Sequence, residues 1–139
     1  MSFREKAAWI AVLAYALVFG GYFYSLWQSW DVRWGAGLSL GLMVGAVVML
    51  VIITAGLTII VALLNPKEAD APADEREKLI ELKSERIASY TLSALLICLI
   101  GTLLVGWNGV LVANLLLGAM VIAELAKALA QIAYYRAGA

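Results

Sequence analysis

Four long apolar stretches constrain this chain more than any other feature of its sequence. A stretch of about 20 apolar residues is long enough to cross the hydrocarbon core of a bilayer as one helix. The first three stretches carry no charged residue, and the fourth carries only Glu124 and Lys127. The stretches run from about Ala7 to Trp27, Leu38 to Leu64, Ile87 to Val105 and Val110 to Tyr134. We therefore predict an all-α membrane protein with four transmembrane helices.

The composition agrees with this prediction. Of the 139 residues, 64% are hydrophobic and only 14% are charged, whereas soluble domains are nearer half apolar and a quarter charged. We expect residues 1–139 to form a single transmembrane domain, with a linker and a helix extension at residues 65–86. A retained first helix is favoured over a cleaved signal peptide, because aromatic residues form an interfacial belt at the outer end of the first stretch and just after it. These residues are Phe19, Tyr22, Phe23, Tyr24, Trp27, Trp30 and Trp34.

The Lys and Arg residues predict the orientation. Nine of the ten lie at the N-terminus, in the central loop or near the C-terminus, and only Arg33 lies on the other side. By the positive-inside rule, both termini and the central loop face the cytoplasm, and the chain belongs to an inner (plasma) membrane. Short connections at about Gln28–Gly37 and at Gly106–Gly109 predict two antiparallel hairpins, which together make an up-down four-helix bundle.

The second stretch carries a row of three glycines, Gly37, Gly41 and Gly45, which fall on one side of a helix. Such a row, often called a glycine zipper, lets another helix approach closely. That helix is either a neighbour in the same bundle, which we favour, or part of a second copy of the chain in a homo-oligomer.

The segment between the hairpins holds most of the charge. Asn65-Pro66 ends the second helix, and Pro72 followed by acidic residues predicts that the third helix begins near Pro72. This helix then projects about two to three turns into the cytoplasm, with an apolar side made by Leu79, Ile80 and Leu82. The projection is either a solvated helix end or a surface that binds a cytoplasmic protein partner. The residues that would bind this partner are Asp74, Glu75, Arg76, Lys78 and Arg86.

The stretch DEREKLIELKSERIASY, Asp74–Tyr90, resembles a signature of small four-span prokaryotic membrane proteins of unknown function. Members of that family carry a D-E-R-x run and a later R-I-A-x-Y stretch between the second and third helices. Some relatives sit beside helix-turn-helix regulators, so the resemblance implies a prokaryotic membrane partner for a soluble protein. It implies no catalytic residue.

Glu124 and Lys127 are the unusual residues of the fourth stretch. Glu124 lies about 15 Å from Tyr134 along a helix, and an unpaired charge at that depth costs at least about 2.5 kcal/mol. Lys127 can extend its charge toward the lipid headgroups. Reading the helices at equal depth predicts an intramembrane polar site around these two residues. Its other members are Tyr15, Thr54 and Ser93, with Ser89, Tyr90 and Arg86 within two turns.

Three interpretations of Glu124 stay open. The first, which we favour, is that Glu124 is a hydrogen-bond anchor or half of a Glu124–Lys127 pair. The second is that Glu124 is a protonatable site in a small proton-coupled transporter of amphipathic solutes. The third is that Glu124 makes a contact within a larger membrane complex, of which the chain is a structural subunit. Small multidrug-resistance exporters are similar in size and helix number, but their glutamate lies in the first helix, where residues 7–27 have none. We also predict that Asn114, in the outer half of the fourth stretch, anchors a hydrogen bond between helices.

Several kinds of chemistry have no residues to support them. The chain has no histidine and a single cysteine, and it contains no nucleotide-binding, metalloprotease or serine-hydrolase motif. We therefore expect no enzyme activity, no metal and no cofactor. A net charge of zero gives no field to attract nucleic acid, so membrane lipid and the protein partners named above are the expected interactions. The leading hypothesis is a non-enzymatic membrane interaction or regulatory module.

Overall fold

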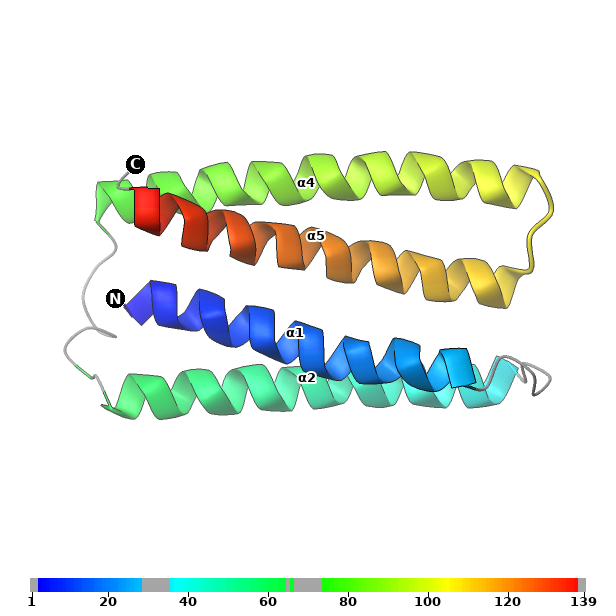
Figure 1. Cartoon of the computed structure of the whole chain (residues 1–139), viewed down its shortest axis with the longest axis horizontal. Helices are drawn as coiled ribbons and strands as arrows, with labels where there is room; N and C mark the ends of the chain where they lie inside the picture. The colour runs from blue at the N-terminus through cyan, green and yellow to red at the C-terminus, as the bar shows by residue number, and fades with distance from the viewer. Residues whose placement is uncertain (1–2, 29–35, 65, 67–73, 138–139) are drawn as a thin grey trace.

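Among the residues that it describes, the computed structural model of the chain contains four long helices (Figure 1). It describes residues 3–28, 36–64, 66 and 74–137. The helices are α1 (Phe3–Gln28), α2 (Ala36–Leu64), α4 (Glu75–Leu104) and α5 (Gly109–Ala137). All four are long and apolar enough to cross a membrane. The prediction of four such helices is confirmed, and each helix begins before its predicted apolar stretch.

Local interactions define the ends of α4 and the start of α5. Asp74 is extended, and its carboxylate accepts a hydrogen bond from the backbone N–H of Glu75 at 2.8 Å, which caps α4. The helix therefore starts later than the predicted start near Pro72, which lies outside the described residues. After α4 the chain turns at Gly106, whose φ of 86° favours glycine. Asn108 then caps α5 by accepting a hydrogen bond from a backbone N–H two residues on, which completes the predicted α4–α5 hairpin.

The helices lie in the order α4, α5, α1, α2 (Figure 1). α5 packs closely on α4, α1 packs on both α5 and α2, and α2 reaches α5 only slightly. The two outer helices, α2 and α4, share at most a marginal contact among the described residues. The helices alternate in direction as predicted, and because α2 and α4 barely meet among the described residues, we call this arrangement an open row. The starts of α1 and α4 and the ends of α2 and α5 lie at one end of the row, which we call the termini end.

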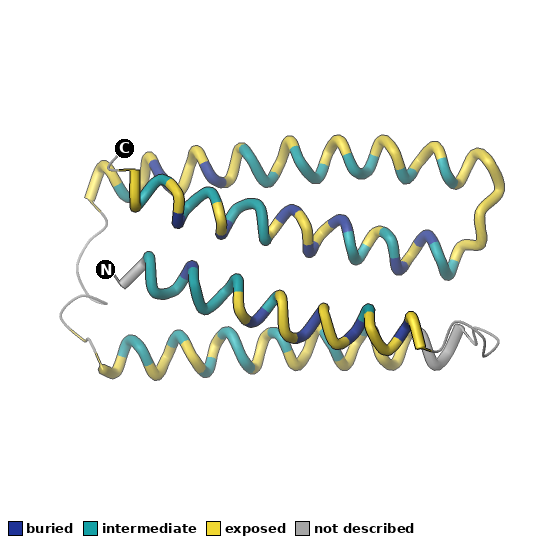
Figure 2. Tube along the Cα trace, viewed as in Figure 1, coloured by how far each residue is buried: buried dark blue, intermediate teal, exposed yellow. Residues whose placement is uncertain are grey.

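The buried core lies between the two inner helices. Val18, Phe19, Tyr22 and Leu26 of α1 pack with Val121 of α5. Figure 2 shows the buried residues concentrated on α1, α5 and the start of α4. α2 contributes only partly buried residues to this core, and most of its large apolar side chains are exposed. For helices that span a bilayer, the hydrophobic effect supplies little attraction between helices, and close packing of the inner pair would then have to hold the row together.

Among the glycines that the structure describes, Gly118 of α5 makes the closest contact with a neighbouring helix. A Cβ placed on Gly118 of α5 would lie 3.3 Å from the tip of the Phe23 ring of α1, tighter than an ordinary contact. A Cβ on Gly41 or Gly45 would meet no atom within 4 Å. The favoured interpretation of the glycine row, packing on a helix of the same chain, is therefore not supported at these two positions. The surroundings of Gly37 lie outside the described residues.

Replacing Gly118 with leucine is expected to destabilise the protein, because the larger side chain must displace Phe23 from the α1–α5 contact. Overpacking of this kind costs about 1–3 kcal/mol. Unfolding of the detergent-solubilised protein by SDS, followed by circular dichroism, measures the loss. Gly45→Leu is the matched control, and it is expected to change the free energy of unfolding by less than about 0.5 kcal/mol. An equal loss at Gly45 would contradict this assignment and would indicate a second chain packed on α2.

Candidate functional site

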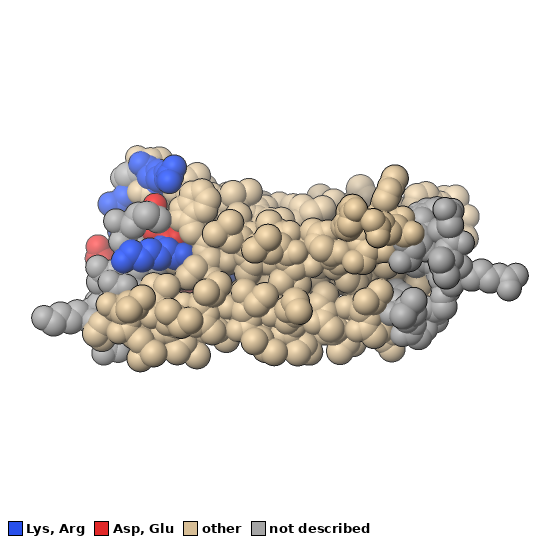
Figure 3. All heavy atoms as spheres, turned by 60° about the horizontal axis from the view of Figure 1, so that its bottom comes forward, with Lys and Arg blue, Asp and Glu red and all other residues tan. Residues whose placement is uncertain are grey.

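The charged residues that the structure describes gather at the termini end, as Figure 3 shows for one face of the molecule. Residues 7–28 of α1, all of α2, residues 87–104 of α4 and residues 109–123 of α5 contain no Lys, Arg, Asp or Glu. The ionisable chemistry of the described chain is therefore concentrated where α1 and α4 begin and where α5 ends.

Lys127 joins α5 to α4. Its Nζ donates a hydrogen bond to Oε2 of Glu85 at 2.8 Å, so Lys127 pairs with Glu85 on the neighbouring helix and not with Glu124, which corrects the predicted pair. The register of the two antiparallel helices explains this choice. Ser84, one residue before Glu85 in α4, and Ala128, one residue after Lys127 in α5, are both buried, as expected for neighbouring positions of two antiparallel helices.

Glu124 is exposed on α5, and its carboxylate has no hydrogen-bond partner in the part of the chain that the structure describes. The Lys127 ammonium and the Tyr15 hydroxyl of α1 are close enough to interact with it electrostatically. Of the five residues predicted to form the intramembrane polar site, the structure therefore brings together Tyr15, Glu124 and Lys127.

Thr54 and Ser93 do not join this group. Thr54 Oγ1 donates a hydrogen bond to the backbone oxygen of Leu50 in its own helix at 2.7 Å. Ser93 is exposed, and its separation from the buried Ser84 places it on the opposite side of α4 at 3.6 residues per turn. These two residues were predicted because they lie at about the same depth as Glu124, but depth alone does not show on which face of its helix a residue lies.

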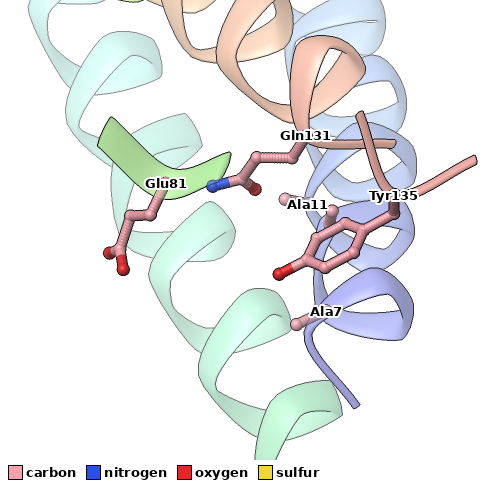
Figure 4. A pocket seen from close by; sticks show the side chains of 6 residues that line it. Ala7, Ala11, Glu81, Gln131 and Tyr135 are labelled. Carbon is pink, nitrogen blue, oxygen red and sulfur yellow. The ribbon is translucent and has the colours of Figure 1, made fainter. Parts of the chain in front are cut away.

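A cavity of about 240 Å³ opens between α1, α4 and α5 at the termini end (Figure 4). The α1 side of the cavity is apolar, because the three α1 residues that line it are all alanines. Gln131 and Tyr135, which line it from α5, continue the line of Glu124 and Lys127 along one side of that helix. We call these four α5 residues the polar stripe. The residues that line the cavity are Ala7, Ala8, Ala11, Glu81, Gln131 and Tyr135.

Comparison with protein-family models, with curated proteins and with solved structures finds no match. The resemblance of Asp74–Tyr90 to a four-span family therefore stays a prediction, and no functional residue is transferred from a relative. Among the described residues, no group of three or more His, Cys, Asp or Glu side chains is arranged to hold a metal ion. The polar stripe and the cavity have to be interpreted from their own geometry.

Cations next to aromatic rings tie α5 to both of its neighbours at the termini end. The Arg136 guanidinium lies 5.5 Å from the centre of the Trp9 ring of α1, and its Nε lies 3.9 Å from Oε1 of Glu5. On the other side, Lys83 Nζ of α4 lies 5.6 Å from the centre of the Tyr134 ring. Such cation–π contacts each contribute about 0.5–1 kcal/mol at exposed sites.

A polar contact also links α1 and α5 within their uncharged segments, away from the charged residues of the termini end. Asn114 Oδ1 accepts a hydrogen bond from the Tyr22 hydroxyl, and its Nδ2 donates one to the backbone oxygen of Val110 at 2.9 Å. Asn114 and Tyr22 are both buried. The prediction that Asn114 anchors a hydrogen bond is confirmed, and its partner on α1 is a residue that sequence reasoning had assigned only to an interfacial aromatic belt.

A double-mutant cycle is expected to show that Lys127 is coupled to Glu85 more strongly than to Glu124. The cycle combines Lys127→Met with Glu85→Gln, and the matched cycle combines Lys127→Met with Glu124→Gln. Because the side chains of Lys127 and Glu85 are 25% and 58% exposed, the first coupling is expected to be only about 0.5–1 kcal/mol. SDS unfolding of the six proteins measures both values. A larger coupling for the Glu124 cycle would contradict the observed pairing.

Proposed function

We propose that the chain spans a prokaryotic inner membrane four times, with its termini and residues 65–86 in the cytoplasm. The uncharged segments of α1 and α4, residues 7–28 and 87–104, are about 33 and 27 Å long at 1.5 Å per residue. These lengths are close to the roughly 30 Å of a bilayer hydrocarbon core. The basic residues on the termini side support the cytoplasmic assignment through the positive-inside rule.

We further propose that the protein is a non-enzymatic membrane module that binds a cytoplasmic protein through the start of α4. The observation that carries this proposal is one exposed helix side, which we call the docking face. Its residues recur at helical spacing and combine three charges with two leucines that are 49% and 68% exposed. This is the pattern of a surface that receives another helix or an apolar groove. The docking face consists of Glu75, Lys78, Leu79, Leu82 and Arg86.

The opposite side of the same segment is fixed to the rest of the protein. Ile80 is 2% exposed and Ser84 is fully buried, and Lys83 and Glu85 contact α5. The segment is therefore packed along α5. A preformed surface loses less conformational entropy on binding than a mobile one, which favours a role in recognition over that of a solvated helix end.

Two of the predicted partner-binding residues fall outside the docking face. Asp74 caps α4, so its first effect is on the helix that presents the face. Arg76 is exposed but lies on another side of the helix at 3.6 residues per turn. We therefore assign binding mainly to Glu75, Lys78 and Arg86 among the charged residues.

A photo-crosslinking amino acid at Leu82 is expected to capture a discrete protein partner in cells. The matched control places the same amino acid at Leu104, which is 84% exposed at the far end of α4 and is expected to capture lipid only. Immunoblotting after irradiation measures the products. Reversing the charge at Lys78 and Arg86 to glutamate should remove the Leu82 product while the protein stays in the membrane fraction. An absent product at Leu82, or one that survives both reversals, would contradict the proposal.

A second candidate function, proton-coupled transport of amphipathic solutes, is favoured by the surroundings of Glu124. Its carboxylate has no hydrogen-bond partner among the described residues, and Lys127, the nearest candidate counter-ion on its own helix, already binds Glu85. An acidic residue within a membrane-spanning helix is typical of a transport pathway. It also lies at one end of the polar stripe, whose other end reaches the cavity.

For this second candidate, Glu124→Gln is expected to abolish proton-coupled flux while the protein remains folded, because the amide cannot exchange the proton. Proteoliposomes with a pH gradient and a fluorescent amphipathic cation provide the measurement. Lys127→Met is the informative companion, since it leaves the carboxylate in place and is expected to retain flux. Equal flux in wild type and Glu124→Gln would eliminate transport through this residue.

A further inference from the structure

The docking face carries two cations that find no partner in the described part of the chain. Lys78 and Arg86 are both exposed, and neither side chain makes a hydrogen bond, ion pair or ring contact with another described residue. Lys127 differs from them, because it already binds Glu85. Two unpaired positive charges on a surface that also exposes leucines favour a binding partner with complementary acidic groups.

Arg86 is the more isolated of the two cations. The four positions one turn away from it on α4, residues 82, 83, 89 and 90, are Leu, Lys, Ser and Tyr, so none is acidic. The adjacent Glu85 is directed to α5, where it binds Lys127. Lys78 has acidic residues one turn away, at positions 74, 75 and 81, but it forms no ion pair with these described residues. The positive charge of Arg86 is therefore the main feature that a partner has to match.

The spacing of the docking face sets the geometry of a matching helix. Lys78 and Arg86 are eight residues apart, about 12 Å along α4. The exposed Leu79 and Leu82 lie between them on the same side of the helix. A helix packed along α4 rises by the same amount per residue. Such a helix therefore needs apolar residues in its middle and two flanking acidic residues about seven to eight positions apart.

We propose that the docking face binds an acidic amphipathic helix of a cytoplasmic protein. One Asp or Glu of this helix lies near Lys78, another lies near Arg86, and its apolar residues pack against Leu79 and Leu82. An arginine can pair with a carboxylate through two parallel hydrogen bonds, so the contact with Arg86 gives the surface most of its selectivity. This assignment of the partner rests on the proposed docking function.

A second copy of the chain and an anionic lipid surface both match these charges less well. Two copies inserted in one membrane have the same orientation, so a two-fold contact through their docking faces sets Arg86 against the same residue of the other copy. Like charges at one depth repel each other and disfavour this pairing. Lipid headgroups can reach Arg86, which borders the uncharged segment of α4. Lys78 lies about 12 Å further from the membrane core, beyond the roughly 5–8 Å of the headgroup layer.

The test measures the binding of two labelled peptides to the full chain in nanodiscs of zwitterionic phosphatidylcholine, with empty nanodiscs as the background. Both peptides carry the same leucine stripe and are about 20 residues long, because shorter isolated helices are only marginally stable in water. One peptide has a glutamate on each side of the stripe, and the other has lysines in their place. Fluorescence anisotropy is expected to give about tenfold tighter binding of the acidic peptide, the ratio that two attractive and two repulsive exposed charge pairs produce. Raising the salt to about 1 M should remove most of this preference.

Charge exchange then locates the preference on the docking face. Lys78→Glu combined with Arg86→Glu is expected to reverse it, so that the basic peptide binds about tenfold tighter. Arg86→Glu alone should bring the two affinities close together. The matched control is Arg76→Glu, the same change at an exposed position on another side of α4, and it should keep most of the wild-type preference.

Equal binding of the two peptides by the wild-type chain would overturn the proposal, and this outcome depends on no variant. A preference for the acidic peptide that survives the exchange of both Lys78 and Arg86 would also overturn it, because that peptide would then bind elsewhere.

The cross-link at Leu82 separates this failure from a failure of docking itself. Mass spectrometry of the Leu82 product is expected to map it to a helical segment with acidic residues on both sides of the attachment point. If the product maps to a segment without acidic residues or to a second copy of the chain, the surface docks a protein but the acidic helix is wrong. If no product forms, docking itself is wrong.

Discussion

The contact between α1 and α5 joins the two hairpins, and the rest of the structure depends on it. Gly118 lets the Phe23 ring approach α5, the buried Tyr22–Asn114 hydrogen bond crosses the same contact, and Val121 packs among the buried α1 residues. In the membrane that we propose, lipid tails are as apolar as these side chains, so close packing and hydrogen bonding, rather than burial, supply the attraction. Without this contact, each hairpin would be a separate pair of helices.

The same contact determines where polar chemistry is available. Because α1 and α5 are the inner helices and the row stays open, one side of α5 faces the gap between α1 and α4, and the polar stripe lies on that side. The alanines of α1 leave the gap unfilled at the termini end. In the membrane that we propose, the cost of placing charge in hydrocarbon explains why the described charged residues are confined to this end, where Arg86 and Glu124 border the uncharged segments of α4 and α5.

The helices and their approximate bounds were predictable from the sequence, because a long uncharged apolar segment has no other stable form in a bilayer. The role of Asn114 was predictable for a similar reason, since a buried amide needs a partner. The partner of Lys127 was not predictable from the sequence. The depth of a residue can be estimated only to about one helical turn, and depth does not show which neighbouring helix a side chain faces. A row such as Gly41 and Gly45 shows which residues share a face but not what that face meets, whereas Gly118 stands alone and carries no pattern.

The distance between the outer helices tests the open row most directly. Spin labels at Val48 of α2 and Tyr90 of α4, both exposed and at similar depth by the hairpin registers, can be placed in a Cys98→Ser background and diluted with unlabelled protein in nanodiscs. With helices spaced 8–10 Å apart, pulsed electron paramagnetic resonance is expected to give roughly 20–30 Å, two to three spacings. A separation of about 10 Å, one spacing, would show that α2 and α4 meet in a closed bundle and would contradict the account.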